Sequence, residues 1–588
     1  MSAYHDILKQ ATRLRQTGEF EQARQLVQRS VQRTPRDPAL WVLLSALQME
    51  ARQLDQAEFS SKKAVELAPN APAALSTLAQ AYGQQRGKEH LAIELGRRAL
   101  AIDPKHEASI SALSMALHRT GDLHGCREVL AKACVELARP GELRHNYARL
   151  LLELGRGPAA MEQIEIALRE NPSHSDLVRF AAMASHYSDQ LSPLDVFERH
   201  KHAGTLAERH PILPPLPPDA DLASSARRIR VGFVSADFRS HSVASFIEPL
   251  LRSIDRSRFE TSLWWTGDKT DEITARLRST TDAWHELVSL SDIQAARLIR
   301  EQGIDVLCDL AAYTTGGRPG LFAMRPARLH LSMIGYPGTT GSSRMDARLV
   351  DAITDPVGPA DALAAEKLIR LPGCFLCYQP PGHLIDVRPR EPGPIVFGSF
   401  NNAAKISAST ARLWQRVLDA VPGSRLFMKV KGVNTLAGEE FCREGLAAIG
   451  LDTSRIDLMP YTATVGEHLA MYHRVDIALD TYPYHGITTT CEALWMGVPV
   501  ISRAGEVHAS RVGASLLSAA GLPELAATGD DEYVRIASGL AGDAARLGVL
   551  RASLREQLMQ SSLCDQAAYA TKWASAVEGT LGTVRAAR

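Results

Sequence analysis

The stretch Asp480-Thr-Tyr-Pro-Tyr-His-Gly-Ile-Thr-Thr-Thr-Cys-Glu492 lies between two apolar runs and decides how the surrounding chain folds. The run before it, Val475–Leu479, is short and apolar, which predicts a buried strand. After it, Cys491–Met496 predicts a helix and Gly497–Ile501 the next strand. The stretch is therefore expected to be a strand-to-helix loop, with three threonines where the helix begins.

The start of that helix is a candidate phosphate site. A helix N-terminus has unpaired N–H groups and the positive end of the helix dipole, and both favour an anion. Glu492, one turn into the helix, is placed to accept hydrogen bonds from a ribose. The stretch thus suggests a site for a sugar-nucleotide diphosphate held by Thr488, Thr489 and Thr490. An ordinary threonine-capped helix is the alternative that this stretch alone leaves open.

Length and composition point to a multidomain protein without a strong charge preference. The chain has 588 residues, enough for about three or four domains, with 66 basic and 66 acidic residues and 45% hydrophobic content. Equal charges give no indication of a nucleic-acid or membrane partner. The chain has no apolar run of about 18 residues and its first residues show no signal pattern, so we expect a cytoplasmic protein. Cys374 and Cys377 have metal-like spacing without a second pair of ligands, and packing is the favoured interpretation.

The first 200 residues carry a repeat. Prolines recur at spacings of 34, 35 and twice 34 residues, at positions 35, 69, 104 and 172. Glycines keep a spacing of 34 residues at positions 87, 121 and 155. This period is typical of tetratricopeptide repeats (TPR), helix pairs that must stack to complete their core. About five repeats are expected between residues 4 and 174, with capping helices over 175–209 and a groove that binds protein; a purely structural solenoid is the alternative.

Beyond a proline-rich connector at 210–220 the pattern changes to alternating strands and helices. The predicted strands are Arg228–Ser235, Phe259–Trp265, Ile304–Leu310 and Leu329–Gly335, and the predicted helices are Phe246–Ile254 and Ser291–Glu301. This alternation predicts a parallel, doubly wound sheet, in which ligands bind at the carboxyl ends of strands.

Two turns at that edge are candidates for the site. His241 follows the first strand and is a candidate general base, with a helix-capping histidine as the alternative. The glycine-rich loop Gly335–Gly341, with Gly338 and Thr339, follows a later strand and is a candidate supporting loop.

A second α/β series starts after another proline-rich connector at 388–394. Its first strand, Ile395–Asn402, ends in Asn401 and Asn402, and Lys405 follows three residues later. A lysine there is placed to neutralise a diphosphate leaving group. The alternative is a lysine that is exposed to solvent and has no such role, as most lysines are. The cleft segments show no paired acidic metal motif, so we expect the lysine and the helix N-terminus to take the place of a divalent ion.

Five motifs, in order along the chain, resemble one glycosyltransferase family, which contains nucleocytoplasmic protein O-GlcNAc transferase and plant SPINDLY. They are Arg230-Val-Gly-Phe-Val-Ser-Ala-Asp-Phe238 with His241, Arg325-Pro-Ala327 with Ile334–Gly341, Gly398–Lys405, Asp480–Glu492 and Ala504–Leu516. The resemblance implies an all-α TPR superhelix followed by an α/β GT-B glycosyltransferase with two Rossmann-like lobes. The expected domains are repeats at 1–209, a linker at 210–225, an N-terminal lobe at 226–385, a linker at 386–394, and a nucleotide-sugar-binding lobe with the C-terminal helix at 395–588.

The resemblance also implies roles for particular residues. It implies inverting, metal-independent transfer of a sugar to Ser or Thr hydroxyls of proteins. His241 matches a cleft histidine whose role as base is disputed, and Lys405 matches a lysine on the diphosphate. Thr488 and Thr489 match phosphate-binding threonines, and Glu492 takes the place of an acidic ribose ligand. His468 falls near the nucleotide base, whereas Asp480 and His485 are expected to support the loop.

The donor is open between two nucleotide sugars. Ile487 stands where O-GlcNAc transferases usually have a histidine, and Val465 where they have a lysine near the uracil. Other segments, such as Thr488–Glu492, are more similar to SPINDLY, and this similarity implies GDP-fucose as the donor. We expect UDP-GlcNAc because it is the donor more widely assigned in the family, with GDP-fucose as the alternative. A non-catalytic scaffold and a transferase acting on small molecules are the less favoured classes.

Overall fold

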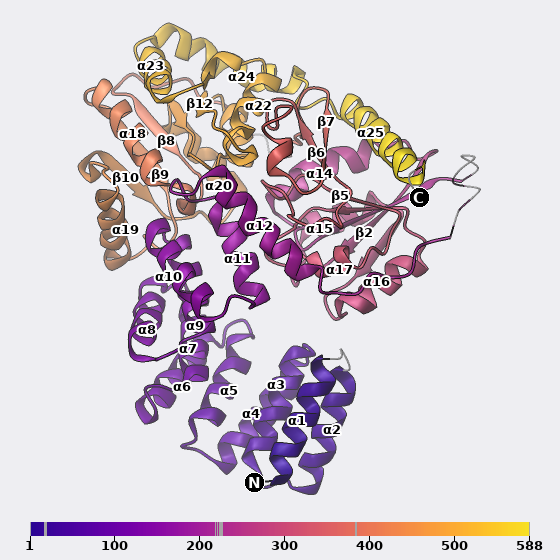
Figure 1. Ribbon diagram of the computed structural model, residues 1–588. Coiled ribbons are helices and arrows are strands. Elements are labelled where there is room, and N and C mark those ends of the chain that lie inside the picture. The colour runs from indigo at the N-terminus through magenta and orange to yellow at the C-terminus, as the bar shows by residue number, and fades with distance from the viewer. Residues whose placement is uncertain are drawn as a thin grey trace. The chain divides into compact units, whose positions relative to one another are not determined.

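The structure is a computed structural model that describes residues 2–16, 20–217, 219, 222, 227–382 and 385–586 (Figure 1). It divides into two compact units, which are treated separately below. The first is essentially residues 1–151, and the second contains nearly all of the chain from 172 onward.

The N-terminal part consists of paired helices, which confirms the predicted helical repeat array. The helices are α1 (Ser2–Gln16), α2 (Phe20–Arg33), α3 (Pro38–Glu50), α4 (Leu54–Leu67), α5 (Pro72–Gly83), α6 (Glu89–Ile102), α7 (Glu107–Thr120), α8 (Leu123–Glu136), α9 (Glu142–Glu153) and α10 (Gly157–Glu170). Small residues at the helix crossings, such as Ala23, Ala57 and Ala92, are fully buried. Their small size lets neighbouring helices approach closely, as the 34-residue period predicts.

The turns inside the helix pairs explain the repeated glycines. Gly87, Gly121 and Gly155 have φ of 88°, 81° and 74°, a left-handed conformation that glycine adopts without strain. Arg52 holds the equivalent position in an earlier repeat with φ of 58°. A residue with a Cβ is strained there.

Exchanging the two residue types should shift stability in opposite directions. Gly121→Ala is expected to lower the free energy of unfolding by about 1 kcal/mol, and Arg52→Gly to raise it by up to about 1 kcal/mol. An added Cβ at Gly121 meets no atom within 4 Å, so the cost there is one of backbone conformation. Urea unfolding of the full chain measures both changes. Gln53→Gly is the control, because Gln53 has a φ of −87° and gains nothing from glycine.

The second unit begins with α11 (Ser175–Ser185) and α12 (Pro193–Ala207), followed by a parallel sheet. The strands are β1 (Ile229–Ser235), β2 (Phe259–Trp265), β3 (Ala283–Glu286), β4 (Val306–Asp309), β5 (Leu329–Ser332), β6 (Ala347–Asp351) and β7 (Lys367–Leu371). The helices between them are α14 (Ser242–Ser253), α15 (Glu272–Ser279), α16 (Asp292–Glu301) and α17 (Pro319–Ala323). The strand order is β3-β2-β1-β4-β5-β6-β7.

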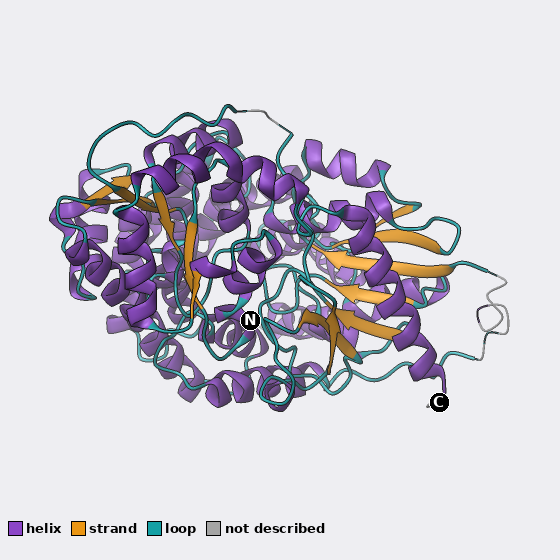
Figure 2. Ribbon diagram, turned by 90° about the horizontal axis from the view of Figure 1, so that it is seen from above, coloured by secondary structure: helices purple, strands orange, loops and turns teal. Residues whose placement is uncertain are grey.

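A second parallel sheet has the same order of winding, β10-β9-β8-β11-β12-β13. Its strands are β8 (Val396–Ser399), β9 (Arg425–Lys429), β10 (Ile456–Met459), β11 (Ile477–Leu479), β12 (Val500–Arg503) and β13 (Ala526–Ala527). Helices α18 (Ala408–Ala420), α19 (Leu436–Ala448), α20 (Val465–Ala470), α21 (Thr488–Trp495), α22 (Val512–Ala519), α23 (Asp530–Ala541) and α24 (Ala544–Gln560) accompany it. Figure 2 shows the strands of the unit with helices around them. The predicted pair of doubly wound sheets is confirmed.

The shared strand order defines where ligands can bind. In each sheet the winding reverses between two adjacent strands, β1 and β4 in the first sheet and β8 and β11 in the second. Crevices at the carboxyl ends of strands at such a switch point bind ligands in open α/β sheets. The stretch Asp480–Glu492 consists of the loop after β11 and the first residues of α21, and the turn after β1 contains His241.

Several element boundaries differ from the sequence prediction. The helix after β11 starts at Thr488, three residues earlier than predicted, and β12 extends from Val500 to Arg503 instead of covering Gly497–Ile501. Gly497 has φ of 75° and ends the helix, so it cannot begin an extended strand. The prediction also omitted β3, β6 and β7, which are only four or five residues long and carry charged residues.

The C-terminal helix α25 (Gln566–Ala586) follows the second sheet in sequence but packs against the first. Its Trp573 is fully buried beside Phe233 and Phe259, with ring centroids 6.0 and 5.7 Å away. Tyr569 donates its hydroxyl to the Phe375 carbonyl at 3.0 Å. The helix thus ties the two α/β halves together.

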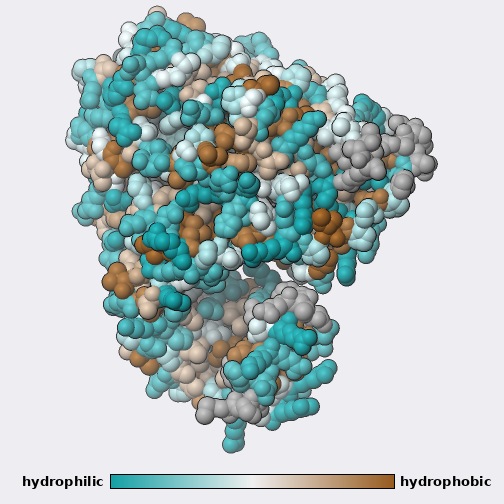
Figure 3. Space-filling view, viewed as in Figure 1, coloured by the Kyte–Doolittle hydropathy of each residue, from teal (hydrophilic) through white to brown (hydrophobic). Residues whose placement is uncertain are grey.

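On the face drawn in Figure 3, apolar residues are scattered among hydrophilic ones. Within the described ranges, no helix is long and apolar enough to span a membrane.

Candidate functional site

The loop after β11 is shaped by Asp480, which is 4% exposed. Its Oδ1 accepts from the backbone N–H groups of Thr481 (2.9 Å) and Gly486 (2.7 Å), and its Oδ2 from the Ser502 hydroxyl (2.7 Å). Asn401, at the end of β8, adds its side-chain amide at 3.3 Å. Asp480 therefore joins the two strands of the switch point and fixes the path of the loop.

His485 supports the same loop from the inside. It is fully buried, and its Nδ1 accepts from the Gly513 N–H at 3.0 Å while its Nε2 donates to the Arg503 carbonyl at 2.9 Å. Burial lowers the pKa of His485, although Asp480 opposes the shift. A neutral, buried imidazole with a hydrogen bond at each ring nitrogen has a structural role.

The hydroxyl groups of the three threonines differ in their hydrogen bonds. Thr489 donates its hydroxyl to Asn401 Oδ1 at 2.8 Å, and Thr490 donates to the Gly486 carbonyl at 3.1 Å. The Thr488 hydroxyl oxygen is buried and has no hydrogen-bond partner among the described residues. In the described chain, α21 also has no side-chain cap at its N-terminus. The helix end beside Thr488 is therefore available to an anion.

Glu492 is held by a chain of two further polar side chains, His468 and Lys429. His468 Nε2 donates to its carboxylate at 2.9 Å, and Lys429 Nζ lies 2.5 Å from His468 Nδ1. Burial lowers the pKa of Lys429, opposed by the charge of Glu492. The sequence analysis missed Lys429; the signal was a lysine that ends an otherwise apolar strand.

Lys429 is expected to position Glu492 through His468. We expect Lys429→Met to raise the Kd of a bound nucleoside diphosphate about tenfold, because removing one member of a charged hydrogen-bond chain costs about 1.5–3 kcal/mol. Isothermal titration calorimetry measures the change. The matched control is Lys431→Met, since Lys431 pairs with Glu153 at 2.8 Å and does not reach His468. Equal affinities for both variants would contradict the positioning role.

His241 lies at the N-terminus of α14, where its Nδ1 accepts from the Val243 N–H at 3.3 Å. It is therefore a helix cap, and its side chain is also 39% exposed. Burial lowers the pKa of His241, while Asp237 raises it and Arg239 lowers it further. With Nδ1 accepting, the neutral ring carries its proton on Nε2. That tautomer donates a hydrogen bond to a ligand at Nε2, and the role of His241 as a base stays a prediction.

One cleft brings His241, Thr488 and Glu492 together. Its open volume is about 1440 Å³, and the first-sheet side contributes the α14 N-terminus, Arg252 and Arg276. The two arginines pair with the buried Glu248 at 2.7 Å each. We call this space the donor cleft. Its lining residues are Ser240, His241, Ser242, Ala244, Ser245, Glu248, Arg252, Glu272, Ile273, Arg276, Tyr378, Gln379, Pro380, Pro381, Gly382, Val465, Thr488 and Glu492.

Lys405 lies behind the loop after β11 and is not one of the residues that line the donor cleft. Its Nζ donates to the His485 carbonyl at 2.6 Å and lies 3.9 Å from the ring centroid of Tyr484. Burial lowers the pKa of Lys405 to about 8, against the opposing effect of Asp480. Asn402, nearby, accepts from the Ala404 N–H at 3.1 Å and shapes the turn that carries the lysine.

Gly338 and Thr339 do not lie in the donor cleft. The Thr339 hydroxyl donates to the Glu366 carboxylate at 2.6 Å. Gly338 and Thr339 line a different cavity, together with His186. The sequence analysis also missed His186, whose ring centroid is 6.2 Å from that of Tyr484. Its place in a helical repeat region gave no signal of a role beside the α/β sheets.

The described residues include no cluster of three or more His, Cys, Asp or Glu side chains that could hold a metal ion. The two cysteines at 374 and 377 are buried and free.

The fold and cleft together define the class: helical repeats followed by two doubly wound sheets of the GT-B type, with a cleft at their strand ends. Comparison with known proteins gives the particular family. The glycosyl transferase family 41 model matches residues 183–380 and 389–573, so the chain belongs to that family.

Individual relatives agree with this assignment. The chain is 36% identical over 418 residues to the probable UDP-N-acetylglucosamine–peptide N-acetylglucosaminyltransferase SPINDLY of Arabidopsis thaliana, covering 68% of this chain and 45% of that protein. It is 28% identical over 466 residues to the UDP-N-acetylglucosamine–peptide N-acetylglucosaminyltransferase of Caenorhabditis elegans, covering 59% of this chain and 40% of that protein. The chain thus spans less than half the length of these two relatives.

A solved structure covers nearly the whole chain. A mutant of the Thermobaculum terrenum O-GlcNAc transferase aligns with a TM-score of 0.75 and 29% identity, over 94% of this chain and 98% of that one. The order of repeats and α/β sheets is therefore shared over both proteins.

Proposed function

We propose that this protein is an inverting glycosyltransferase that moves N-acetylglucosamine from UDP-GlcNAc to Ser or Thr hydroxyls of proteins. The observation that carries the proposal is the uncapped N-terminus of α21, with the unpaired Thr488 hydroxyl, opening into the donor cleft beside Glu492. The names of the relatives, which specify UDP-N-acetylglucosamine and peptide, support the choice of donor and acceptor.

In the proposed reaction the acceptor hydroxyl oxygen bonds to the anomeric carbon as the bond from that carbon to the diphosphate oxygen breaks. The hydroxyl proton passes to a base, and UDP leaves with the bonding electrons. The N-terminus of α21 and Lys405 stabilise the charge that develops on the diphosphate, so no metal ion is required for that purpose. Glu492 holds the ribose and His468 lies towards the nucleotide base.

GDP-fucose is the alternative donor, and Val465 is the observation that favours it. Val465 lines the donor cleft, at the position where the resemblance to O-GlcNAc transferases leads us to expect a lysine near the uracil. The relatives' names point instead to UDP-GlcNAc. Incubating the protein with each labelled donor and a protein acceptor, followed by mass spectrometry of the acceptor, tests the proposal. Transfer from GDP-fucose alone would overturn the assignment of UDP-GlcNAc as the donor. Label found only in small metabolites would overturn the assignment of proteins as the acceptors.

The repeat array is proposed to bind the protein acceptor through its groove, and a cytoplasmic location is proposed with it. We propose neither a nucleic-acid nor a membrane partner. Removing residues 1–151 is the direct test of the groove, because the donor cleft lies entirely in the second unit. Donor binding should persist while transfer to proteins falls.

The pH dependence of transfer should report Lys405. Because burial lowers its pKa to about 8, the free enzyme loses this cation as pH rises through that value. We expect kcat/KM, which reflects groups of the free enzyme, to fall above about pH 8. A pH–rate profile measures this. A kcat/KM that stays constant to pH 10 would contradict a role for the charged amine.

A further inference from the structure

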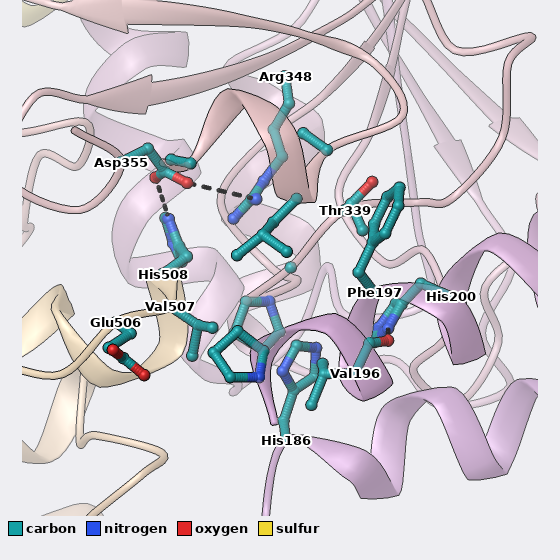
Figure 4. A pocket seen from close by; sticks show the side chains of 16 residues that line it. His186, Val196, Phe197, His200, Thr339, Arg348, Asp355, Glu506, Val507 and His508 are labelled. Carbon is teal, nitrogen blue, oxygen red and sulfur yellow. Dashed lines mark hydrogen bonds and ion pairs between the residues drawn. The ribbon is translucent and has the colours of Figure 1, made fainter. Parts of the chain in front are cut away.

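A second cavity of the second unit is lined by three parts of the chain that are distant in sequence. They are α11 and α12 with their connection, the loops after β5 and β6, and residues 506–508 (Figure 4). Its open volume is about 450 Å³. Its described lining has no residue in common with that of the donor cleft. We call it the Arg348 cavity.

Arg348 reaches into this cavity without adequate pairing. Its residue is 4% exposed, and its nearest carboxylate oxygen, on Asp355, is 3.9 Å from Nη1. Its Nη2 is buried and finds no hydrogen-bond partner in the described parts of the chain. A guanidinium cannot lose its charge in a protein, so burial without acceptors is costly. The cavity must supply an acceptor.

His186, across the cavity, is also buried and lacks hydrogen bonds to its side chain among the described residues. It is 5% exposed, and both ring nitrogens are buried without a partner among the residues described. Neighbouring His200 is different, since its Nδ1 bonds the Val196 carbonyl at 2.7 Å and its Nε2 the Tyr336 hydroxyl at 2.6 Å. Figure 4 shows His186 and the Arg348 guanidinium on opposite sides of the cavity.

Two carboxylates, those of Asp355 and Glu506, line the cavity, and a third, that of Glu366, contacts the lining residue Thr339 without lining the cavity itself. Asp355 accepts from His508 at 2.6 Å, and its pKa is lowered by His508 and Arg348 even though burial opposes this. The Glu366 carboxylate accepts from the Thr339 hydroxyl at 2.6 Å. Glu506 lies at the rim in Figure 4 with its carboxylate turned away from Arg348. One guanidinium nitrogen of Arg348 and both ring nitrogens of His186 lack a hydrogen-bond partner among the described residues, so the complementary ligand is rich in acceptor oxygens.

We propose that the Arg348 cavity binds an oxyanion, a carboxylate or phosphate group, through Arg348 and His186. Arginine matches the two oxygens of such a group. Water can fill the volume, but an oxyanion offers the guanidinium two acceptor oxygens in a geometry that matches its own donors. This site goes beyond sugar transfer and does not depend on it.

A groove connects the cavity with the protein surface. It has an open volume of about 480 Å³ and shares His186, Pro193, Val196, Glu506 and Val507 with the cavity. From there it continues along Ser188, Asp189, Tyr482 and Pro483. The oxyanion can therefore be a free ion or the acidic side chain of a polypeptide lying in the groove.

Titration of the full chain with inorganic phosphate, followed by calorimetry and thermal unfolding, tests the proposal. We expect Arg348→Met to weaken the cavity's phosphate affinity at least tenfold and His186→Gln to weaken it severalfold. Arg344→Met is the matched control, because Arg344 donates to the His210 and Ala323 carbonyls outside the cavity and should leave binding unchanged. Comparing the variants also separates this site from the N-terminus of α21, which they do not alter.

A crystal grown in phosphate gives the direct readout. Density for the anion within hydrogen-bond distance of Arg348 supports the proposal, even if one variant fails to fold. A dry or water-filled cavity at saturating phosphate, or an affinity equal in all variants, overturns it. Competition by a capped peptide with one glutamate, but not by its glutamine counterpart, assigns the anion to a polypeptide. Binding of phosphate without such competition assigns it to a free ion.

Discussion

Replacing Lys405 with methionine is expected to lower kcat/KM for sugar transfer about 100-fold or more, with little change in the stability of the fold. Removing one preorganised charge or donor from a developing anion costs roughly 10²–10³ in rate. In the absence of a donor the Lys405 amine is held by the His485 carbonyl at 2.6 Å, on the loop that leads to α21. The amine therefore contacts the loop that leads to the proposed diphosphate site, although it does not line the donor cleft.

The control for this variant is Lys367→Met, on the exposed side of β7 and away from the cleft. Steady-state kinetics with UDP-GlcNAc and a protein acceptor gives both values, and circular dichroism checks the fold. If Lys405→Met retained the rate of Lys367→Met, the result would refute stabilisation of the leaving group by Lys405 and would support a non-catalytic scaffold. A rise in KM with unchanged kcat would instead indicate a lysine that only binds the donor.

Replacing Asp480 with alanine is expected to destabilise the second unit by about 3 kcal/mol and to abolish donor binding. The substitution leaves buried donors on Gly486, Ser502 and Thr481 without their acceptor, and each such group costs about 1–3 kcal/mol. For a unit of this size the melting temperature should fall by roughly 3–4 °C. The loop that carries Thr488 would then lose its fixed path.

Thermal unfolding and nucleotide titration together test this prediction. Asp531→Ala is the control, because its side chain is 96% exposed and pairs only with Arg416 among the described residues. We expect it to change stability by less than about 0.5 kcal/mol. Asp480→Asn should lie between the two, since an amide keeps one acceptor oxygen. Normal stability in Asp480→Ala would show that the loop is held by other groups.

The sequence was most informative where a pattern is local. The 34-residue period and its glycines predicted the helix pairs, because each turn needs a left-handed residue regardless of what surrounds it. The alternation of strands and helices predicted β2 to the residue and placed the threonines before Glu492 at a helix start. Where the prediction was wrong, as at Gly497–Ile501, a helix-ending glycine had been taken as the first residue of a strand.

Other features depend on residues that are distant in sequence. Lys429, His468 and Glu492 form one chain of contacts, although β9, α20 and α21 bring them from separate segments. Nothing in the spacing of these residues indicates that Glu492 is bonded to an imidazole. The same holds for Thr339, which faces a cavity beside Arg348 and His186 instead of the donor cleft.

The sequence by itself determined the helical repeats, the two alternating α/β series and the position of the candidate phosphate-binding loop, because each follows from short-range periodicity and backbone preference. Only the tertiary structure decided which side chains share a cleft and that α25 returns to the first sheet. It also decided that Arg348 Nη2 and both His186 ring nitrogens are buried without a hydrogen-bond partner among the described residues. Burial and pairing are properties of the packed chain: they depend on which distant segment covers a residue, and local sequence does not encode that.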